Sequence, residues 1–309
     1  MRRILAIDGG GIRGIIAARI LVEIERLAGK SLAETFDIIA GTSTGGIIAC
    51  GLGVKMRAQA LLDLYVNCGA KIFDRTLWQE ARTIDGLAGP KYDAAPLERI
   101  LKEELGDMRL SDCGTGILVP SYAIELPPPE QGPGSYFFKS WKEPNAYLRD
   151  VGRATSAAET FFAPYRFANL AGATGAYCDG GTFADSPGAC ALADARQLWP
   201  AEEFLLVAIG TGIKVAPIPF AEMRNAGLAK WATKLPSMFM DGEGDAVHYQ
   251  LQRAPDVKYF RLDAALNAAS PALDDASAAN CAALIHDAEA GLAKQAVDLK
   301  TIADLLGAP

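Results

Sequence analysis

The sequence predicts an α/β fold of three layers (α/β/α), in which a central, mainly parallel sheet lies between two layers of helices. The chain has 309 residues, of which 50% are hydrophobic, so it can bury a large core. Short apolar runs that end in glycine alternate with segments of helical spacing. This alternation is typical of parallel sheets covered by helices, which bind ligands beyond the carboxyl ends of their strands.

Two strand, turn and helix units open the chain. Residues 3–7 form an apolar run that ends in an aspartate and three glycines, and residues 12–28 then show helical spacing. Residues 36–40 form a second apolar run, which is followed by the sequence GTSTGG and by a small-residue helix over 47–54. Both units therefore place a glycine-rich turn at the carboxyl edge of the predicted sheet.

The remaining elements follow from the same patterns. We expect helices over 57–73 and 96–105 with a loop around 86–90 between them, strands over 116–126 and 135–140 joined by a rigid Pro/Gly loop, further strands over 205–209 and 257–262, and a helical segment over 278–306. No internal repeat or clean linker is visible. We therefore expect a single domain over residues 1–309, with a core over about 2–212 and a helical C-terminal cap over about 213–309.

Composition narrows the function classes. The net charge of −7 argues against a nucleic-acid polymer as ligand. The six cysteines form no CxxC or Cys/His cluster, so neither a zinc site nor a disulfide framework is expected. The N-terminal apolar run is too short for a signal peptide, and the charge-free stretch 38–54 is too short to span a bilayer. We expect a cytoplasmic protein that meets a membrane from the side.

A serine stands between two glycines in Gly41-Thr42-Ser43-Thr44-Gly45, a G-x-S-x-G sequence between a predicted strand and a predicted helix. The two glycines allow a sharp turn that exposes the Ser43 hydroxyl, and the N–H groups of the following helix point at the same place. Such donors stabilise a developing oxyanion. The corner therefore suits acyl transfer by Ser43, although a tightly packed turn without catalytic function remains an alternative.

The serine hydroxyl needs a base. The chain has two histidines, His248 and His286, and a triad of Ser43, Asp179 and His248 has the chain order of an α/β-hydrolase. Asp179 is itself the other candidate base, because it directly precedes Gly180 and Gly181, where the backbone can approach another element closely. An aspartate base would need partial desolvation to raise its pKa from about 3.9.

The N-terminal glycine loop, Asp8-Gly9-Gly10-Gly11-Ile12-Arg13-Gly14, has the G-x-G-x-x-G spacing of a dinucleotide-binding fingerprint. The acidic residue expected at the end of the second strand is missing, since Glu34 precedes that strand. The loop could instead offer its amides to an oxyanion or a lipid phosphate, with Arg13 as a nearby positive charge. A nucleotide-binding oxidoreductase remains an alternative at this point.

In combination, DGGGIRG at 8–14, GTSTGG at 41–46 and DGG at 179–181 resemble the patatin-like phospholipase family. The stretch 153–162 and the sequence DGGTFADSPG are similar to further family motifs, as is the strand that ends in GTG at 210–212. Two positions depart from the usual pattern, Glu159 in place of a proline and Asp185 in place of an asparagine. The likeness covers about residues 2–212.

The resemblance implies a patatin-like fold and a serine–aspartate dyad that hydrolyses lipid acyl esters. Its nucleophile would be Ser43 and its base Asp179, and the elbow and DGG glycines would be Gly41, Gly45, Gly180 and Gly181. The oxyanion hole would lie in the glycine loop at Gly9, Gly10 and Gly11, with the amides of Gly10 and Gly11 as donors and Arg13 assisting. The mechanism implies no metal and no cofactor. The sequence DGEGD at 241–245 departs from a calcium loop, and we interpret it as a solvated turn.

The expected partners are a phospholipid or lysophospholipid substrate and the membrane surface. Residues 220–240 carry apolar side chains at helical spacing together with basic ones, which fits a lid, an interfacial helix or an ordinary helix packed on the core. The compact layout resembles phospholipase effectors of anti-phage signalling, so a cyclic-nucleotide activator and a homo-oligomer are kept as hypotheses. A catalytically silent lipid- or nucleotide-binding protein of the same fold remains the main alternative.

Overall fold

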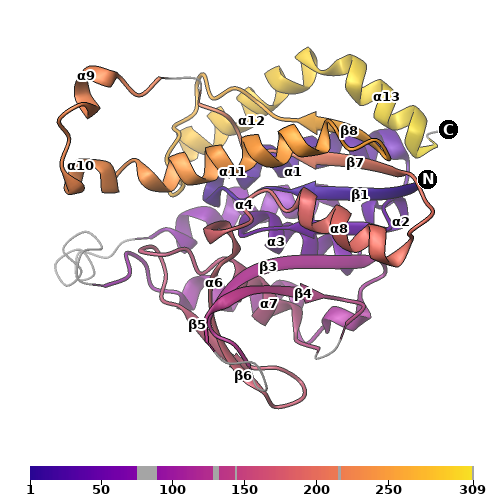
Figure 1. The fold of residues 1–309 in the computed structure, drawn as a ribbon, viewed down its shortest axis with the longest axis horizontal. Coiled ribbons are helices and arrows are strands. Elements are labelled where there is room, and N and C mark those ends of the chain that lie inside the picture. The colour runs from indigo at the N-terminus through magenta and orange to yellow at the C-terminus, as the bar shows by residue number, and fades with distance from the viewer. Residues whose placement is uncertain (75–88, 128–131, 143–144, 215–216, 308–309) are drawn as a thin grey trace.

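The computed structural model describes residues 1–74, 89–127, 132–142, 145–214 and 217–307. One eight-stranded sheet forms its centre, in the order β5-β6-β3-β2-β1-β7-β8 with β4 paired to β3 (Figure 1). Its strands are β1 Arg2–Ile7, β2 Ile38–Gly41, β3 Gly116–Glu125, β4 Gly134–Lys139, β5 Tyr165–Ala168, β6 Thr174–Asp179, β7 Phe204–Ile209 and β8 Val257–Leu262. Pairing is parallel from β3 through β2, β1 and β7 to β8, and antiparallel where β4 and β6 meet β3 and where β5 meets β6.

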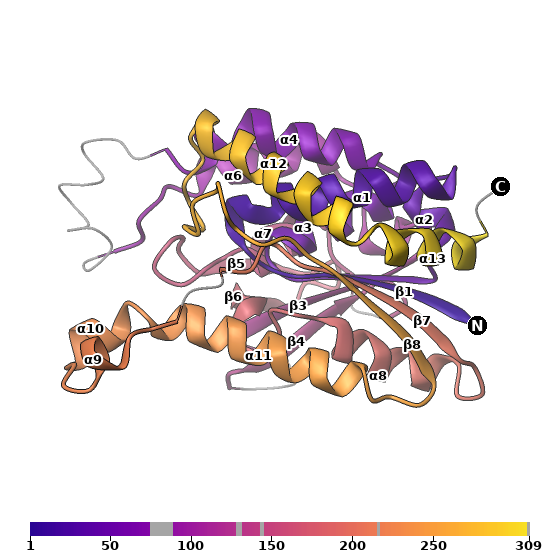
Figure 2. The ribbon, with the colours of Figure 1, turned by 90° about the horizontal axis from the view of Figure 1, so that it is seen from above.

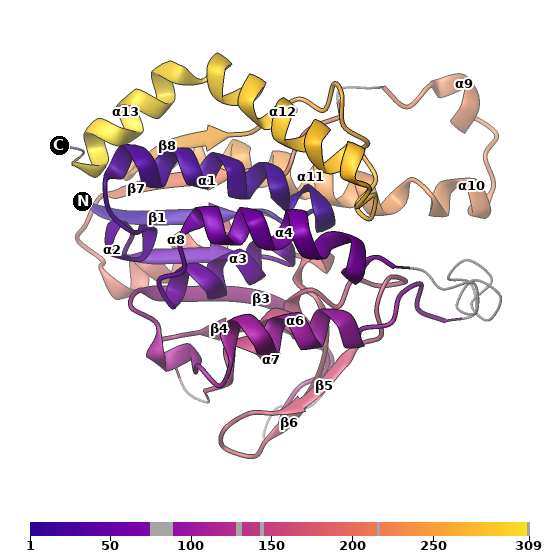
Figure 3. The same ribbon diagram turned by 180° about the vertical axis from the view of Figure 1, so that it is seen from behind.

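Helices cover both faces of the sheet, which confirms the predicted three-layer α/β fold. Figure 2 shows α8 and α11 on one face and the larger group, with α1, α4, α12 and α13, on the other. The helices are α1 Gly14–Ala28, α2 Leu32–Thr35, α3 Thr44–Gly53, α4 Ala58–Ile72, α6 Ala95–Leu105, α7 Leu148–Thr155, α8 Gly188–Leu198, α9 Phe220–Met223, α10 Leu228–Ala232, α11 Leu235–Leu251, α12 Ala278–Lys294 and α13 Ala296–Leu306. Figure 3 shows the larger layer from behind.

The alternating faces of β1 explain why its run is apolar throughout. Leu5 and Ile7 belong to the core cluster that contains the α1 side chains, whereas Ile4 and Ala6 belong to the cluster beneath α8. Successive side chains of a strand point to opposite faces, and both faces of a parallel strand are covered by helices. The short apolar runs at 3–7, 36–40 and 205–209 therefore form central strands, and their carboxyl ends share one edge of the sheet.

Two segments differ from the sequence interpretation. The predicted turn at 241–245 lies inside α11, because Glu243 packs against the start of α8 and accepts a hydrogen bond from the Ser186 amide at 2.9 Å. This tertiary contact overrides the low helix propensity of Gly242 and Gly244. The helical segment over 278–306 is divided at Gln295 into α12 and α13. The expected loops around 86–90 and 127–134 lie partly outside the described residues.

Other expected elements occur within a few residues of their predicted bounds, with β8 at 257–262 as one example. Strands β5 and β6 and helices α7 and α8 were not predicted, because their segments are short or interrupted by glycine and are stabilised by long-range partners. Within the described ranges, no helix is both long and apolar enough to cross a membrane.

Candidate active site

Ser43 occupies the turn between β2 and α3, at the carboxyl edge of the sheet. Its backbone angles are φ 54° and ψ −120°, a conformation that residues with a Cβ rarely adopt. The flanking glycines allow close backbone contact: a Cβ on Gly41 would lie 2.0 Å from the Gly45 carbonyl oxygen, and one on Gly45 would lie 2.2 Å from the Ile7 carbonyl oxygen. The structure therefore explains why both glycines flank this serine.

Asp179 ends β6 and faces Ser43, although the two residues are 136 positions apart in the chain. The Ser43 hydroxyl donates a hydrogen bond to Asp179 Oδ2 at 2.7 Å, and the Gly181 amide donates to Oδ1 at 2.7 Å. The DGG glycines permit this approach, since a Cβ on Gly180 would lie 2.4 Å from the carbonyl oxygen of Pro120 on β3. A nucleophile and a carboxylate are thus within hydrogen-bonding reach.

The environment of Asp179 alters its acidity. Only 5% of the residue is exposed, and this burial raises the pKa of the carboxyl from 3.8 to about 7. The hydrogen bonds from Gly181 and Ser43 lower the pKa, while the negative charge of Glu159 raises it further. A carboxylate with a pKa near neutrality is a far better proton acceptor than an exposed aspartate.

The glycine loop lies beside the serine: a Cβ on Gly9 would be 3.5 Å from Ser43 Cβ. The Gly9 amide donates to the Asp185 carbonyl oxygen at 3.1 Å, and the Ile12 amide donates to the Leu273 carbonyl oxygen at 2.8 Å. In the part of the chain that the structure describes, the amides of Gly10 and Gly11 have no recorded acceptor. Gly10 and Gly11 therefore offer the free donors, whereas the amide of Gly9 is already engaged.

Packing fixes the loop in this position. A Cβ on Gly10 would lie 2.2 Å from Thr211 Oγ1, and a Cβ on Gly11, where φ is 58°, would lie 2.2 Å from the Leu273 carbonyl oxygen. Thr211 also donates its hydroxyl to the Gly9 carbonyl oxygen at 2.6 Å. The donors of the loop are consequently held by segments far along the chain.

Arg13 follows the loop and carries a cation with few partners. Its Nη1 donates a hydrogen bond to the Gly212 carbonyl oxygen at 3.5 Å, and its Nε is buried without an acceptor among the described residues. Burial lowers the pKa of the guanidinium, an effect opposed by the negative charge of Asp185. Arg13 is therefore a partly buried positive charge that directly follows the loop with the two free amides.

Buried carboxyl groups lie within and next to the loop. Asp8 forms an ion pair with Arg261 at 2.5 Å, and Arg261 also contacts Asp263 at 2.8 Å. Asp185, the residue at the usual asparagine position, is 7% exposed, and its Oδ1 has no recorded hydrogen-bond donor among the described residues. Burial raises the pKa of Asp185 well above its ordinary value, and it raises that of Glu243 to about 7.

Three buried threonines that no sequence motif singled out hold the site together. Thr155 Oγ1 accepts from the Ser43 amide at 3.0 Å and donates to the Pro120 carbonyl oxygen at 2.6 Å. Thr42 donates its hydroxyl to the Ala184 carbonyl oxygen at 2.6 Å, and Thr211 holds the loop as described above. Their partners are distant in sequence, so only their place within the family-like stretches could have drawn attention to them.

The alternative residues lie elsewhere. His248 is on α11, and its recorded hydrogen-bond partners are Tyr259 at 3.1 Å and Gln252 at 2.8 Å. His286 lies on α12, and Glu34 lies on α2, where it forms an ion pair with Lys55 at 3.6 Å. The structure thus brings Asp179 to Ser43 and surrounds His248 with other groups. Within the described ranges, no group of three or more His, Cys, Asp and Glu side chains could hold a metal ion.

Comparison with known proteins agrees with these motifs. The family model described as Patatin-like phospholipase matches residues 5–189. A cGAMP-activated phospholipase from Pseudomonas aeruginosa is 31% identical over 84% of this chain and 77% of its own. Patatin-like protein 2 from Arabidopsis thaliana is 31% identical over 90% of this chain and 79% of its own, and Patatin-T5 from Solanum tuberosum is 29% identical over 94% and 83%.

Proposed function

This chain belongs to the patatin-like phospholipase family, and we propose that it hydrolyses acyl esters of phospholipids or lysophospholipids, as a phospholipase A-type enzyme with a Ser43–Asp179 dyad. The observation that carries the proposal is the 2.7 Å hydrogen bond between the hydroxyl of Ser43 and Oδ2 of Asp179. In this geometry the serine hydroxyl contacts the carboxylate directly, without an intervening histidine. The free amides of Gly10 and Gly11 supply the complementary element, a site for negative charge.

In the acylation step, Asp179 accepts the proton of Ser43 while Oγ attacks the ester carbonyl carbon. The carbonyl oxygen becomes an oxyanion, which the amides of Gly10 and Gly11 stabilise, and the partly buried cation of Arg13 adds a favourable field. When the tetrahedral intermediate collapses, the C–O bond to the lipid alcohol breaks and Asp179 returns the proton to that alcohol. The products of this step are the free alcohol and an ester between the acyl group and Ser43.

In the deacylation step, Asp179 takes a proton from water, and the resulting hydroxide attacks the acyl carbon. The same two amides hold the second oxyanion; on collapse the bond between Ser43 Oγ and the acyl carbon breaks, Asp179 returns the proton to Oγ, and the fatty acid is released. One carboxylate therefore serves both half-reactions. This dual use suits a group whose pKa is about 7, because both its protonated and its ionised forms are accessible near neutral pH.

Release of fatty acid from phospholipid vesicles, measured by mass spectrometry, tests the proposal. We expect hydrolysis by the unmodified protein and loss of at least about 10³-fold in rate for Ser43→Ala, because the nucleophile is removed. Ser135→Ala, at an exposed serine on β4, is the matched control and should keep full activity. Absence of hydrolysis by the unmodified protein, with and without cyclic dinucleotides, would instead support a catalytically silent lipid- or nucleotide-binding protein, and equal nonzero rates for the two proteins would exclude Ser43 as the nucleophile.

The proposal extends to regulation and location. The similarity to a cGAMP-activated phospholipase supports a cyclic-nucleotide activator, and with it a role as a cytoplasmic anti-phage effector that acts peripherally on the inner membrane surface. A homo-oligomeric active form would fit such control. Adding a panel of cyclic dinucleotides, cGAMP included, to a fluorogenic-phospholipid assay tests this part. Flat activity across the panel would contradict it and would leave the hydrolase proposal intact.

A further inference from the structure

A projecting arm, residues 217–240, leaves the body after β7 and returns along the first turns of α11. It contains α9 and α10, and Figures 1 and 2 show both helices extending beyond the sheet and its covering layers. The arm starts on the side where β7 ends, and this is the carboxyl edge that also carries Ser43. An appendage in this position is well placed to meet whatever approaches the candidate active site.

The arm exposes large apolar side chains. The exposed fractions are 79% for Phe220, 84% for Leu228 and 67% for Phe239, and Ile218 and Met238 are exposed as well. Helix α10 contributes no buried residue to the core. These side chains do not pack on the core, so the alternative of an ordinary helix packed on the core is wrong for them. Solvent-exposed apolar side chains gathered in one projecting segment indicate a surface that contacts an apolar partner.

The charge of the arm is opposite to that of the whole protein. It holds three basic residues, Arg224, Lys230 and Lys234, and one acidic residue, Glu222, whereas the chain has a net charge of −7. Lys230 and Glu222 form an ion pair at 3.7 Å, and no ion pair of Arg224 or Lys234 is recorded among the described residues. Apolar and cationic side chains combined on short helices are typical of segments that lie in the interface of an anionic bilayer.

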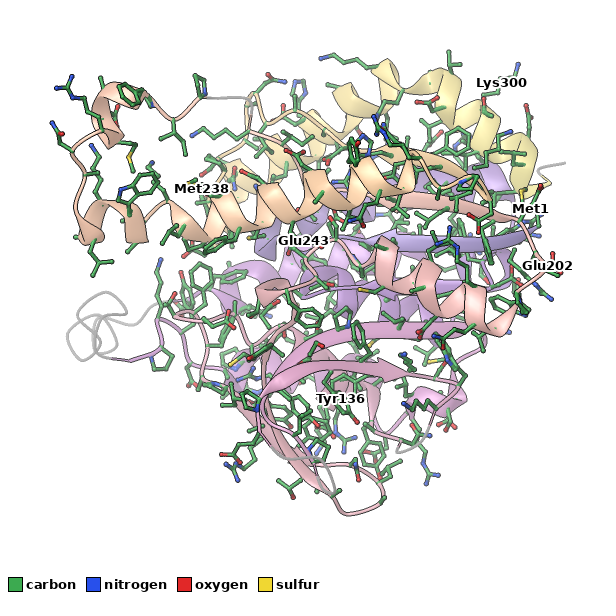
Figure 4. The ribbon with its side chains drawn as sticks, viewed as in Figure 1. Met1, Tyr136, Glu202, Met238, Glu243 and Lys300 are labelled. Carbon is green, nitrogen blue, oxygen red and sulfur yellow. The ribbon has the colours of Figure 1, made fainter. Side chains whose placement is uncertain are left out.

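The root of the arm is linked to the candidate active site. Helix α11 begins in the arm and continues over the body, and Figure 4 labels Met238 toward its arm end and Glu243 over the body. Glu243 accepts the hydrogen bond from the Ser186 amide, and the carbonyl oxygen of the preceding Asp185 accepts from the amide of Gly9. One continuous helix therefore connects the exposed apolar residues with the glycine loop.

We propose that the arm is a docking surface for an anionic lipid bilayer. The side chains of Phe220, Leu228 and Phe239 enter the interface, and Arg224 and Lys234 contact the anionic headgroups. Docking brings the carboxyl edge with Ser43 to the lipid from which the substrate is taken. The proposal rests on the proposed function for the nature of that substrate, but the docking itself is measurable without any hydrolysis.

Vesicle flotation of Ser43→Ala tests the docking in the absence of lipid breakdown. We expect Ser43→Ala to float with vesicles that contain phosphatidylglycerol, to bind pure phosphatidylcholine vesicles at least tenfold more weakly, and to be released by high salt. An arm variant, in which Phe220→Ser, Leu228→Ser and Phe239→Ser are combined with Ser43→Ala, should bind the anionic vesicles at least tenfold more weakly than Ser43→Ala does. A matched triple of exposed apolar residues outside the arm, Ile124→Ser, Leu198→Ser and Val297→Ser, should bind like Ser43→Ala.

The proposal is overturned when anionic vesicles fail to bind Ser43→Ala, or when the arm variant binds them as tightly as Ser43→Ala does. Self-association of Ser43→Ala that the arm substitutions abolish, without vesicle binding, would also overturn it and would assign the arm to a second copy of the chain. Hydrolysis of a dispersed short-chain ester by the unmodified protein separates the two proposals. Hydrolysis of that ester without vesicle binding would refute only the docking proposal. Vesicle binding that depends on the arm, without hydrolysis of the ester, would refute only the proposed function.

Discussion

Replacing Asp179 with asparagine should make the protein more stable while it abolishes hydrolysis. Burial raises the pKa of this carboxyl from 3.8 to about 7, so the folded protein holds a proton that the unfolded chain releases. The carboxyl therefore contributes its full stability below pH 3.8, and that contribution is lost as the pH rises to about 7. Asparagine has a similar shape and carries no charge at any pH, so it avoids this loss.

The size of the effect follows from the shift. A rise of about 3 pKa units corresponds to about 4 kcal/mol at about 1.4 kcal/mol per unit, of which the interval from pH 5 to pH 7 accounts for about 3 kcal/mol. The residue is 5% exposed, so solvent screening reduces the figure little. We therefore expect the stability advantage of Asp179→Asn over the unmodified protein to grow by about 3 kcal/mol between pH 5 and pH 8.

Urea unfolding at closely spaced pH values measures this difference. Asp304→Asn, at an exposed position on α13, is the matched control and should show no pH-dependent gain. In parallel, kcat/KM of the unmodified protein for a soluble ester should rise with a midpoint near pH 7 and fall about tenfold for each pH unit below 6. An advantage of Asp179→Asn that stays constant with pH would refute the burial argument, and a flat rate profile through pH 7 would refute Asp179 as the base.

Three further predictions concern the surroundings of the dyad. The free energy of unfolding of Ser43→Gly should exceed that of Ser43→Ala by about 1 kcal/mol, because glycine adopts φ 54° and ψ −120° without a Cβ clash. Chemical denaturation compares the two variants, and equal stability would contradict the strain argument. The free energy of unfolding of Thr155→Val should fall by about 1–3 kcal/mol for each buried group left unpaired, namely the Ser43 amide and the Pro120 carbonyl, and its kcat should change more than its KM. Thr155→Ser should recover both stability and activity. A fully stable and active Thr155→Val would refute the role of the hydroxyl. Glu159→Gln should move the midpoint of the pH–rate profile to lower pH by a fraction of a unit, because the negative charge of Glu159 raises the pKa of Asp179; an unchanged or higher midpoint would exclude that influence.

The sequence predicted those parts of the molecule whose signals are local. Apolar runs ended by glycine identified the central strands, because a strand covered on both faces must be apolar throughout. The glycines around Ser43 and after Asp179 identified the corners, since close backbone contact excludes a Cβ there. The glycines after Asp179 made it one candidate base for Ser43, but the triad with His248 stayed open, and only the resemblance favoured a direct pairing of Ser43 with Asp179.

The features that the sequence did not predict depend on distant contacts. Thr155 supports the Ser43 amide through a hydrogen bond across 112 positions. Glu243 continues α11 through a segment rich in glycine, because its contact with the Ser186 amide outweighs local propensity. The spacing of residues 220–240 indicated an amphipathic helix, but spacing alone does not say whether an apolar stripe is buried. The structure divides the segment among α9, α10 and the start of α11 and exposes Leu228, Met238 and Phe239.

Thr211 and Leu273 pack against the glycine loop, although both lie beyond the region that the family model matches. The matched region alone therefore does not contain every residue that holds the candidate active site. The matched region ends at residue 189, yet the carbonyl oxygen that anchors Ile12 belongs to Leu273. A chimaera that joined the first half of this chain to the C-terminal half of a relative would need residues that pack against the glycine loop as Thr211 and Leu273 do. Substitutions in the C-terminal part of the chain can therefore shift the amides of the glycine loop, even when the GTSTGG, DGG and glycine-loop motifs are unchanged.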